Sequence, residues 1–232
     1  MRVSLPLHTS SSSSSSVVEG VLSLLTSLFG EPTAADSEEE IAALRRAREQ
    51  TTSVKLDTET DAEAAVGALV VYHMLLERLV PPLEPEVYED RRTLISWNHS
   101  WGEPTPTQAE PTSTAPTWLP GKKKEAPSSG GGATTGSLRL ERVAVLTNLA
   151  SALSARASLL STGEASGADS IKTAAKHFSY AAGALEAAEA LAAVSSGQEH
   201  GGEFRPAALK AAKALLVAHA QVHLSTHPTN PS

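Results

Sequence analysis

The chain contains no cysteine in its 232 residues. Without thiols it can form no disulfide framework, no thiolate metal site and no cysteine nucleophile, which fits a reducing compartment. Aromatic residues are also scarce, at 4%, so Leu, Val and Ala must supply most of the core volume. The hydrophobic content of 41% still predicts one sizeable globular domain.

Positive charge and long apolar runs are in short supply too. With a net charge of −7, the chain is not expected to bind nucleic acid, because such binding depends on Lys and Arg residues that neutralise phosphates. The longest apolar stretch, Val17 to Phe29, contains Glu19 and several Ser and Thr residues, so it predicts a core helix rather than a membrane span. Lys122 to Lys124 are too few to anchor a protein on lipid, and we expect at most peripheral membrane contact.

Catalytic and metal-binding motifs are missing as well. The chain has neither a Gly-x-Ser-x-Gly elbow nor a Gly-x-x-x-x-Gly-Lys phosphate loop, so we predict no enzyme, no catalytic residue and no cofactor. His219, His223 and His227 are spaced so that two at a time could share a helix face and bind a divalent metal. However, no Asp or Glu follows Glu203 to complete a ligand set, so we expect surface or packed histidines and no metal.

Two alanine-rich segments between Leu138 and Leu191 carry the clearest structural pattern. In each, apolar residues recur every three or four positions, which places them on one stripe of an α-helix, and a short Gly/Ser loop joins the two. The stripes consist of Leu140, Val143, Leu146, Ala150, Leu153, Ala157 and Leu160, then of Ile171, Ala174, Ala175, Phe178, Ala182, Leu185 and Leu191. Because alanine lets backbones approach closely, the pair predicts an antiparallel hairpin in a rigid scaffold.

Two helices are predicted before the hairpin near the N-terminus. The first covers Val17 to Phe29 and is stopped by Gly30. The second begins after Asp36, because Asp36 and Glu39 have the spacing of a capping box, in which each side chain can accept a hydrogen bond from the other residue's amide.

Two further helices have recognisable ends. One is capped by Asp57 or Thr58 and ends at Pro81, and the other runs from Pro206 to His227. The apolar face of the former consists of Ala62, Val66, Leu69, Val70, His73, Leu76 and Leu79. That of the latter consists of Leu209, Ala212, Leu216, Ala220 and Leu224. The chain is therefore expected to be helical with one long interruption.

Two segments have a low-complexity composition. Gly102 to Ser137 is dominated by Pro, Thr, Ser and Gly, and cannot bury enough apolar surface to offset the entropy of ordering, so we predict a disordered loop. Met1 to Ser16 is rich in Ser and has no acidic residue, a composition also found in organelle transit peptides. We prefer to interpret it as a strand at Val3 to Leu7 followed by a low-complexity insertion.

Six segments, taken in order, share the pattern of one known family. They are the strand-like Ser4–Leu7, the helical Glu39–Arg48 with its Leu-Arg-Arg, the segment Leu94–Trp101, which resembles a strand ending in Trp and a short polar turn, and the helical Glu141–Leu153, Ala174–Leu185 and Leu215–Gln221. On these segments, which are collinear over nearly the whole chain, the sequence resembles the Bro-one domain of ALIX-like ESCRT accessory proteins.

The resemblance implies a fold class and a domain layout. The fold is expected to be mainly α, with the stacked antiparallel helices of a Bro-type, TPR-like domain and a small N-terminal β element. Residues 1–232 would form a single domain with a disordered insertion at about 102–137, where the family has a variable connection. Because the family's domain continues through further helices, we interpret the chain as C-terminally truncated and expect a monomer.

The resemblance also implies a function and a partner-binding site. The family's domain is a non-enzymatic adaptor of endosomal sorting, cytoplasmic and recruited to endosomes, which binds the amphipathic C-terminal helix of an ESCRT-III subunit in a groove. Leu224 falls where the family has a groove-lining aromatic residue, and Lys172 falls where it has a basic residue. Asp169 lies one position from the family's acidic residue. Leu keeps the site apolar but gives up ring area, so weaker binding is expected.

Alternatives remain open for these residues and for the function. Leu224 could equally be a core residue, and Lys172 an ordinary solvated lysine near a helix start. The domain could be a helical targeting scaffold for another client, as in Rho-effector or phosphatase-linked family members. It could also be a fragment without partner binding, since the family's remaining groove anchors would lie after Ser232.

Overall fold

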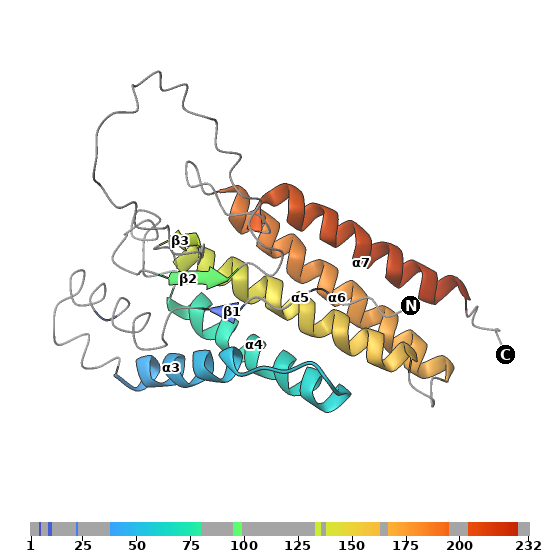
Figure 1. Cartoon of the computed structure of the whole chain (residues 1–232), viewed down its shortest axis with the longest axis horizontal. Coiled ribbons are helices and arrows are strands. Elements are labelled where there is room, and N and C mark those ends of the chain that lie inside the picture. The colour runs from blue at the N-terminus through green and yellow to red at the C-terminus, as the bar shows by residue number, and fades with distance from the viewer. Residues whose placement is uncertain are drawn as a thin grey trace, which may run out of the picture.

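The helices of this protein form one stack in chain order. The computed structural model describes Leu5, Leu22 and residues 9–10, 38–79, 95–98, 133–135, 138–162, 167–194 and 204–226. The helices are α3 (Glu38–Thr52), α4 (Glu59–Leu79), α5 (Leu138–Thr162), α6 (Ala168–Ala193) and α7 (Pro206–Thr226). Each helix packs against the next, most extensively α5 against α6 and α6 against α7 (Figure 1). The expected mainly α fold of stacked helices is confirmed.

Three short strands lie beside the stack. β1 (Thr9–Ser10), β2 (Ile95–Asn98) and β3 (Ala133–Thr135) form an antiparallel sheet in the order β1-β2-β3, with Ser10 opposite Trp97 and Trp97 opposite Ala133. β2 falls inside the strand-like segment Leu94–Trp101. The expected opening strand lies outside the described residues except for Leu5, which is not in a strand, so it stays a prediction.

Other expectations also fall largely outside the described residues. Of the predicted helix Val17–Phe29, only Leu22 is described, and it is helical. Asp36, the predicted cap of the second helix, is not described, although α3 begins two residues later. Of the segment predicted to be disordered, β3 is described and is paired with β2, whereas residues 102–132 are not described.

A capping box starts α4. The Thr58 hydroxyl oxygen accepts the Asp61 amide at 3.1 Å, and the Asp61 carboxylate accepts the Thr58 amide at 3.2 Å. Two amides that the helix cannot satisfy internally thereby gain partners. Of the two caps that the sequence offered, Asp57 and Thr58, the structure uses Thr58.

Two ion pairs fix the register of α4 against α5. Arg142 contacts Glu77 at 2.9 Å, and Arg156 contacts Glu63 at 3.1 Å. The partners are separated by the same number of residues along each helix but in opposite directions, so α4 and α5 run antiparallel. These side chains lie at the edge of the interface and are partly exposed, so they determine alignment more than stability.

α5 is the central helix and is buried on nearly all sides. Its buried residues include the polar Thr147, Ser151 and Ser154, whose hydroxyls donate to carbonyls of the same helix at 2.8–3.0 Å. Leu5 packs against this part of the core, and its amide donates to the Ser154 hydroxyl at 3.2 Å. α5 is long and apolar enough to cross a membrane, but 83% of its most apolar stretch is buried within the protein, as in a core helix. The predicted single stripe on α5 was therefore too narrow.

The predicted apolar face of α4 needs one correction. Val70 is 38% exposed, whereas Ala65 and Tyr72, which the periodicity left out, are fully buried beside Leu69. The buried face of α4 thus extends to Tyr72 at one edge, where the tyrosine hydroxyl has a buried partner, described below. The predicted α6 stripe holds from Ile171 to Leu185.

Candidate functional site

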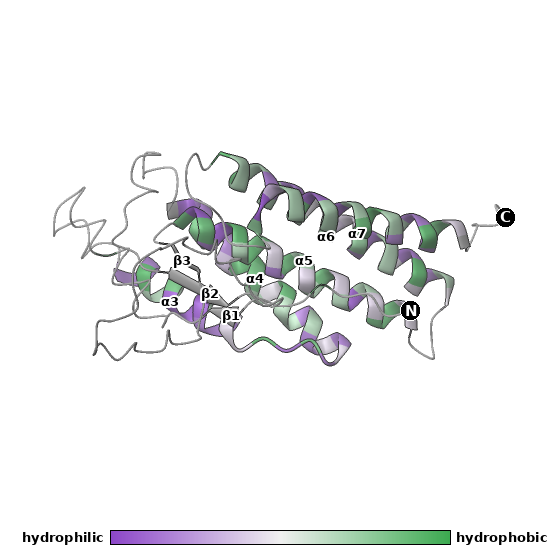
Figure 2. Cartoon of the chain, turned by 45° about the horizontal axis from the view of Figure 1, so that its top comes forward, coloured by the Kyte–Doolittle hydropathy of each residue, from purple (hydrophilic) through white to green (hydrophobic). Residues whose placement is uncertain are grey.

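α6 and α7 form an antiparallel hairpin whose register is set by two contacts. Near one end, the Phe178 ring stacks on His223 with centroids 5.4 Å apart and planes within 7°. Near the other end, the Lys213 ammonium group lies 3.1 Å from the Glu189 carboxylate. The helices lie side by side in both views (Figures 1 and 2). The C-terminal end of α7 therefore lies beside the N-terminal half of α6.

The register places the predicted partner-binding residues at one end of this hairpin. Leu224 of α7 lies beside the turn of α6 that carries Lys176, one turn from Lys172. Leu224 is 56% exposed, so it is not a core residue. Its side chain leaves the α6 contact because it lies about 80° around the helix from the buried Leu216.

Lys172 and Asp169 contact each other. The Lys172 ammonium group lies 3.7 Å from the Asp169 carboxylate, one helical turn away. Asp169 is fully exposed and Lys172 is half exposed, so solvent screens the pair and it contributes little stability. Both side chains remain accessible to a partner. The structure thus brings Lys172 and Asp169 into contact and places Leu224 at the same end, without joining all three.

These side chains project from the same side of the hairpin. Viewed from the N-terminus of α6, successive residues of this right-handed helix turn clockwise. Successive residues of α7, which runs in the opposite direction, turn counterclockwise in the same view. Lys172 is about 100° clockwise from Glu189, which faces α7, and Leu224 is about 80° counterclockwise from Leu216, which faces α6. By the same construction, the exposed Val222 projects from the opposite side.

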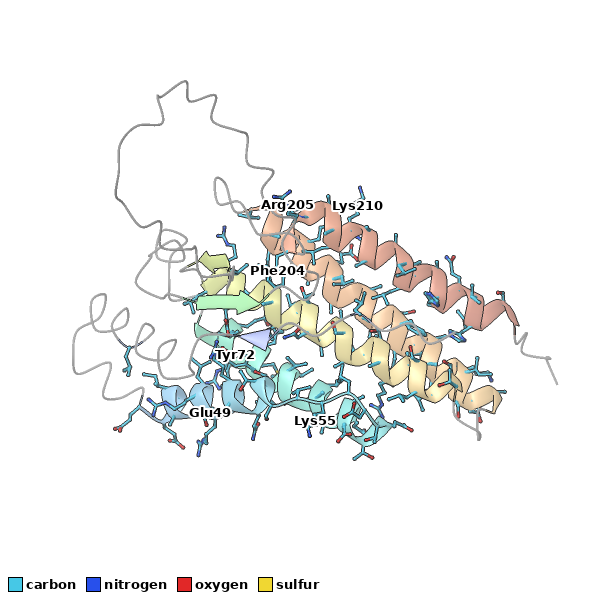
Figure 3. All side chains as sticks on the ribbon, in the orientation of Figure 1. Glu49, Lys55, Tyr72, Phe204, Arg205 and Lys210 are labelled. Carbon is cyan, nitrogen blue, oxygen red and sulfur yellow. The ribbon has the colours of Figure 1, made fainter. Side chains whose placement is uncertain are left out.

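Four further exposed residues share this side, and the sequence interpretation missed them. On α6, Lys176 and Gly183 lie within about 40° of Lys172. On α7, Lys210 and Val217 precede Leu224 by two and one heptads, and Figure 3 shows Lys210 at the N-terminal end of that helix. We call this surface the outer hairpin face: Lys172, Lys176, Gly183, Lys210, Val217 and Leu224. The seven-residue spacing was visible in the sequence, but only the register showed that the two lines meet.

The histidines of α7 pack on an aromatic ring. The His219 ring lies 5.7 Å from Phe178 at 33°, beside the stacked His223, so both imidazoles flank one phenyl group between the helices. Within the described ranges, no group of three His, Cys, Asp or Glu residues is placed to hold a metal ion. His227 lies outside those ranges. The packed interpretation accounts for His219 and His223.

An open hollow of about 620 Å³ lies between the end of α3 and α4. Its lining comprises Gln50, Ser53, Val54, Lys55, Asp61, Ala64, Ala65, Gly67, Ala68 and Val71. Among these, only Lys55 and Asp61 are charged, and Asp61 is engaged in the α4 cap. Figure 3 shows Lys55 in the connection between the two helices. The hollow therefore offers neither a paired acid and base nor a nucleophile with an adjacent base.

A buried polar cluster joins α3, α4 and α5. The Arg48 Nε donates to Glu141 Oε1 at 3.0 Å, and the Tyr72 hydroxyl donates to the same oxygen at 2.7 Å. Each of these residues is at most 1% exposed. Burial and the Glu141 charge raise the pKa of Tyr72 well above its usual value, so the hydroxyl stays a donor. Burial opposes the Arg48 charge, but Glu141 and Tyr72 together outweigh this effect and raise the pKa of Arg48. The cluster is closed to solvent and connects three helices.

Two histidines beside α5 have perturbed titration. Burial, with a further contribution from Arg156, lowers the pKa of His177 against the opposing effect of Glu63. Burial also lowers the pKa of His73. In each ring, the buried Nδ1 has no hydrogen-bond partner among the residues that the structure describes. Neither ring has a nucleophile to activate in the interactions described, so their titration bears on stability.

Comparison with known proteins identifies the family. The model of the family described as BRO1-like domain matches residues 3–226 of this chain, and the search of curated proteins found no match. Three solved structures share the fold: ALIX with the SIVmac239 PYKEVTEDL late domain (TM-score 0.68, 16% identity), an ALIX BRO1 CHMP4C complex (0.65, 17%), and the Bro1 domain described in "Structure basis for endosomal targeting by the Bro1 domain" (0.66, 14%).

The coverage of these structures is unequal. They align with 97%, 96% and 97% of this chain, which spans 28%, 55% and 51% of theirs, respectively. The chain therefore belongs to the BRO1-like domain family and has its helical scaffold fold.

Proposed function

We propose that this protein is an ESCRT-related adaptor that binds the C-terminal amphipathic helix of an ESCRT-III subunit on the outer hairpin face. The family match and the solved ALIX BRO1 complex with CHMP4C support the kind of partner. The neighbour described for endosomal targeting supports recruitment to endosomes. A cytoplasmic location before this recruitment is part of the proposal. The partner helix would use apolar anchors at helical spacing, with flanking charges that set its register.

The exposure of Leu224 carries this proposal. A leucine that is 56% exposed at the end of a helix contributes little to the core, yet offers an apolar contact to a partner. Val217, 41% exposed and seven residues earlier, continues the apolar line along the same side. Lys172 and Lys176 of α6 lie beside the Leu224 end of this apolar line, where they can form ion pairs with carboxylates on the partner helix.

The magnitude of the Leu224 contribution can be bounded. Burial of a leucine side chain is worth roughly 1.5–3 kcal/mol, and the half of its surface that is already covered reduces the gain to about 1–1.5 kcal/mol. An aspartate at this position would also have to be desolvated without a partner. Leu224→Asp should therefore weaken binding by about tenfold or more.

The test is a titration of the 232-residue protein with a fluorescently labelled peptide of the CHMP4C C-terminal helix, monitored by anisotropy. Val222→Asp is a matched control, because Val222 is 55% exposed on the same helix but projects from the other side. We expect the control to bind within about twofold of the unsubstituted protein. Equal loss in both variants would contradict this placement of the site, and no binding by the unsubstituted protein would contradict the partner.

A further inference from the structure

Gly183 is a glycine in the middle of α6 that the packing of this chain does not require. A Cβ atom built at Gly183 meets nothing within 4 Å, and the residue is exposed. Glycine destabilises a helix interior relative to alanine, because it loses more backbone entropy on folding. Within the described structure, α6 therefore gains nothing from the missing side chain.

The surroundings of Gly183 place it at the centre of the outer hairpin face. The register sets it beside Val217 of α7, and Ser179, one turn earlier on α6, is small as well. Lys176 and Leu224 lie toward one end of the face, and Lys210 lies toward the other. A partner helix could thus approach the backbone of α6 closely at its middle, with larger side chains on either side.

We infer that the partner helix crosses the outer hairpin face with its backbone against Gly183. This inference rests on the proposed function and adds the shape and charge of the occupant. The apolar anchors of the partner helix would lie about 10.5 Å apart, which is seven residues along a helix, and would cover both Val217 and Leu224. Close approach at a glycine increases the dispersion contacts that these anchors make.

Charge complementarity specifies the rest of the occupant. α7 contains no Asp or Glu, and Lys176 and Lys210 make no ion pair with any residue in the described ranges. The Asp169 carboxylate already pairs with Lys172, and Glu186 is the other exposed carboxylate of α6 near this face. The occupant is therefore an amphipathic helix whose carboxylates lie next to the anchor that covers Leu224, beside Lys176.

The decisive experiment substitutes alanine at Gly183 and measures folding and binding together. Gly183→Ala should raise Tm by about 1–4 °C, because the new methyl group meets open space and the helix propensity improves. The same methyl group should weaken binding of the labelled CHMP4C peptide by about threefold, because it separates the two backbones. Gly183→Leu should weaken binding by more than about tenfold.

Gly67→Ala provides the matched control. Gly67 is likewise exposed in a helix interior, in α4, with nothing within 4 Å of a built Cβ. It should raise Tm by a similar amount and leave binding unchanged. If the unsubstituted protein binds and Gly183→Ala binds equally well, the inference is overturned while the proposed function stands. If the unsubstituted protein does not bind the peptide, both are overturned.

Discussion

The Arg48–Glu141–Tyr72 cluster allows the stability of the helical stack to be tested directly. Glu141→Leu removes the acceptor of both other side chains and leaves the Arg48 guanidinium buried without its carboxylate partner. Loss of one member of a buried ion pair costs about 3–5 kcal/mol, a large part of the roughly 5–15 kcal/mol that stabilises a domain. Tyr72→Phe removes a single hydrogen bond to a charged group and should cost about 1.5–3 kcal/mol.

The double variant separates the pair from the space it fills. Arg48→Met with Glu141→Leu leaves no unpaired charge, so its loss should be smaller than the sum of the two single losses by about 2 kcal/mol or more. Urea unfolding followed by circular dichroism at 222 nm gives these free energies of unfolding. If Glu141→Leu cost less than about 1 kcal/mol, or if the two single losses simply added, the three side chains would not form a buried coupled cluster.

Two smaller predictions concern pH and the α4 cap. Burial lowers the pKa of both His73 and His177, so the unfolded chain binds protons at these residues more readily than the folded chain. Their contribution to the free energy of unfolding should therefore be complete above pH 6.5 and decrease below it. Chemical denaturation between pH 7.5 and 5.5 should show a smaller decrease for a His73→Gln, His177→Gln variant. An equal fall in both proteins would assign the pH dependence to other groups. Thr58→Ala should cost about 1 kcal/mol in urea unfolding, whereas Thr52→Ala, at an exposed helix end, should cost less; equal losses would argue against the cap.

Local periodicity in the sequence was enough to predict the helices and much of their packing. Proline and capping residues placed both ends of α4, and the alanine-rich stripes predicted the α5–α6 hairpin. Periodicity failed for α5 because it treats Ser and Thr as exposed. Thr147, Ser151 and Ser154 satisfy their hydroxyls on carbonyls of their own helix, so they can be buried at little cost.

Long-range pairs could not be found from local patterns. Arg48 lies in a run of arginines that suits a solvated helix face, and its partner Glu141 is 93 residues away along the chain. The same carboxylate accepts the hydroxyl of Tyr72, 69 residues away from it along the chain. A buried charge is stable only with its partner, so the burial of these residues follows from the tertiary fold rather than from the local sequence.

The helical repeat also explains why Leu224, a member of the predicted apolar face of the last helix, lies outside the core. Leu209, Leu216 and Ala220 are buried because they lie within about 40° of one another around α7. From Leu216, one step of four residues leads to Ala220 and a second leads to Leu224, which therefore lies about 80° around the helix from Leu216. This position is outside the narrow contact that a single neighbouring helix provides. In a helix packed on two sides, the same residue would be buried. Leu224 is thus exposed, and available to a partner, because α6 is the one described helix against which α7 packs extensively.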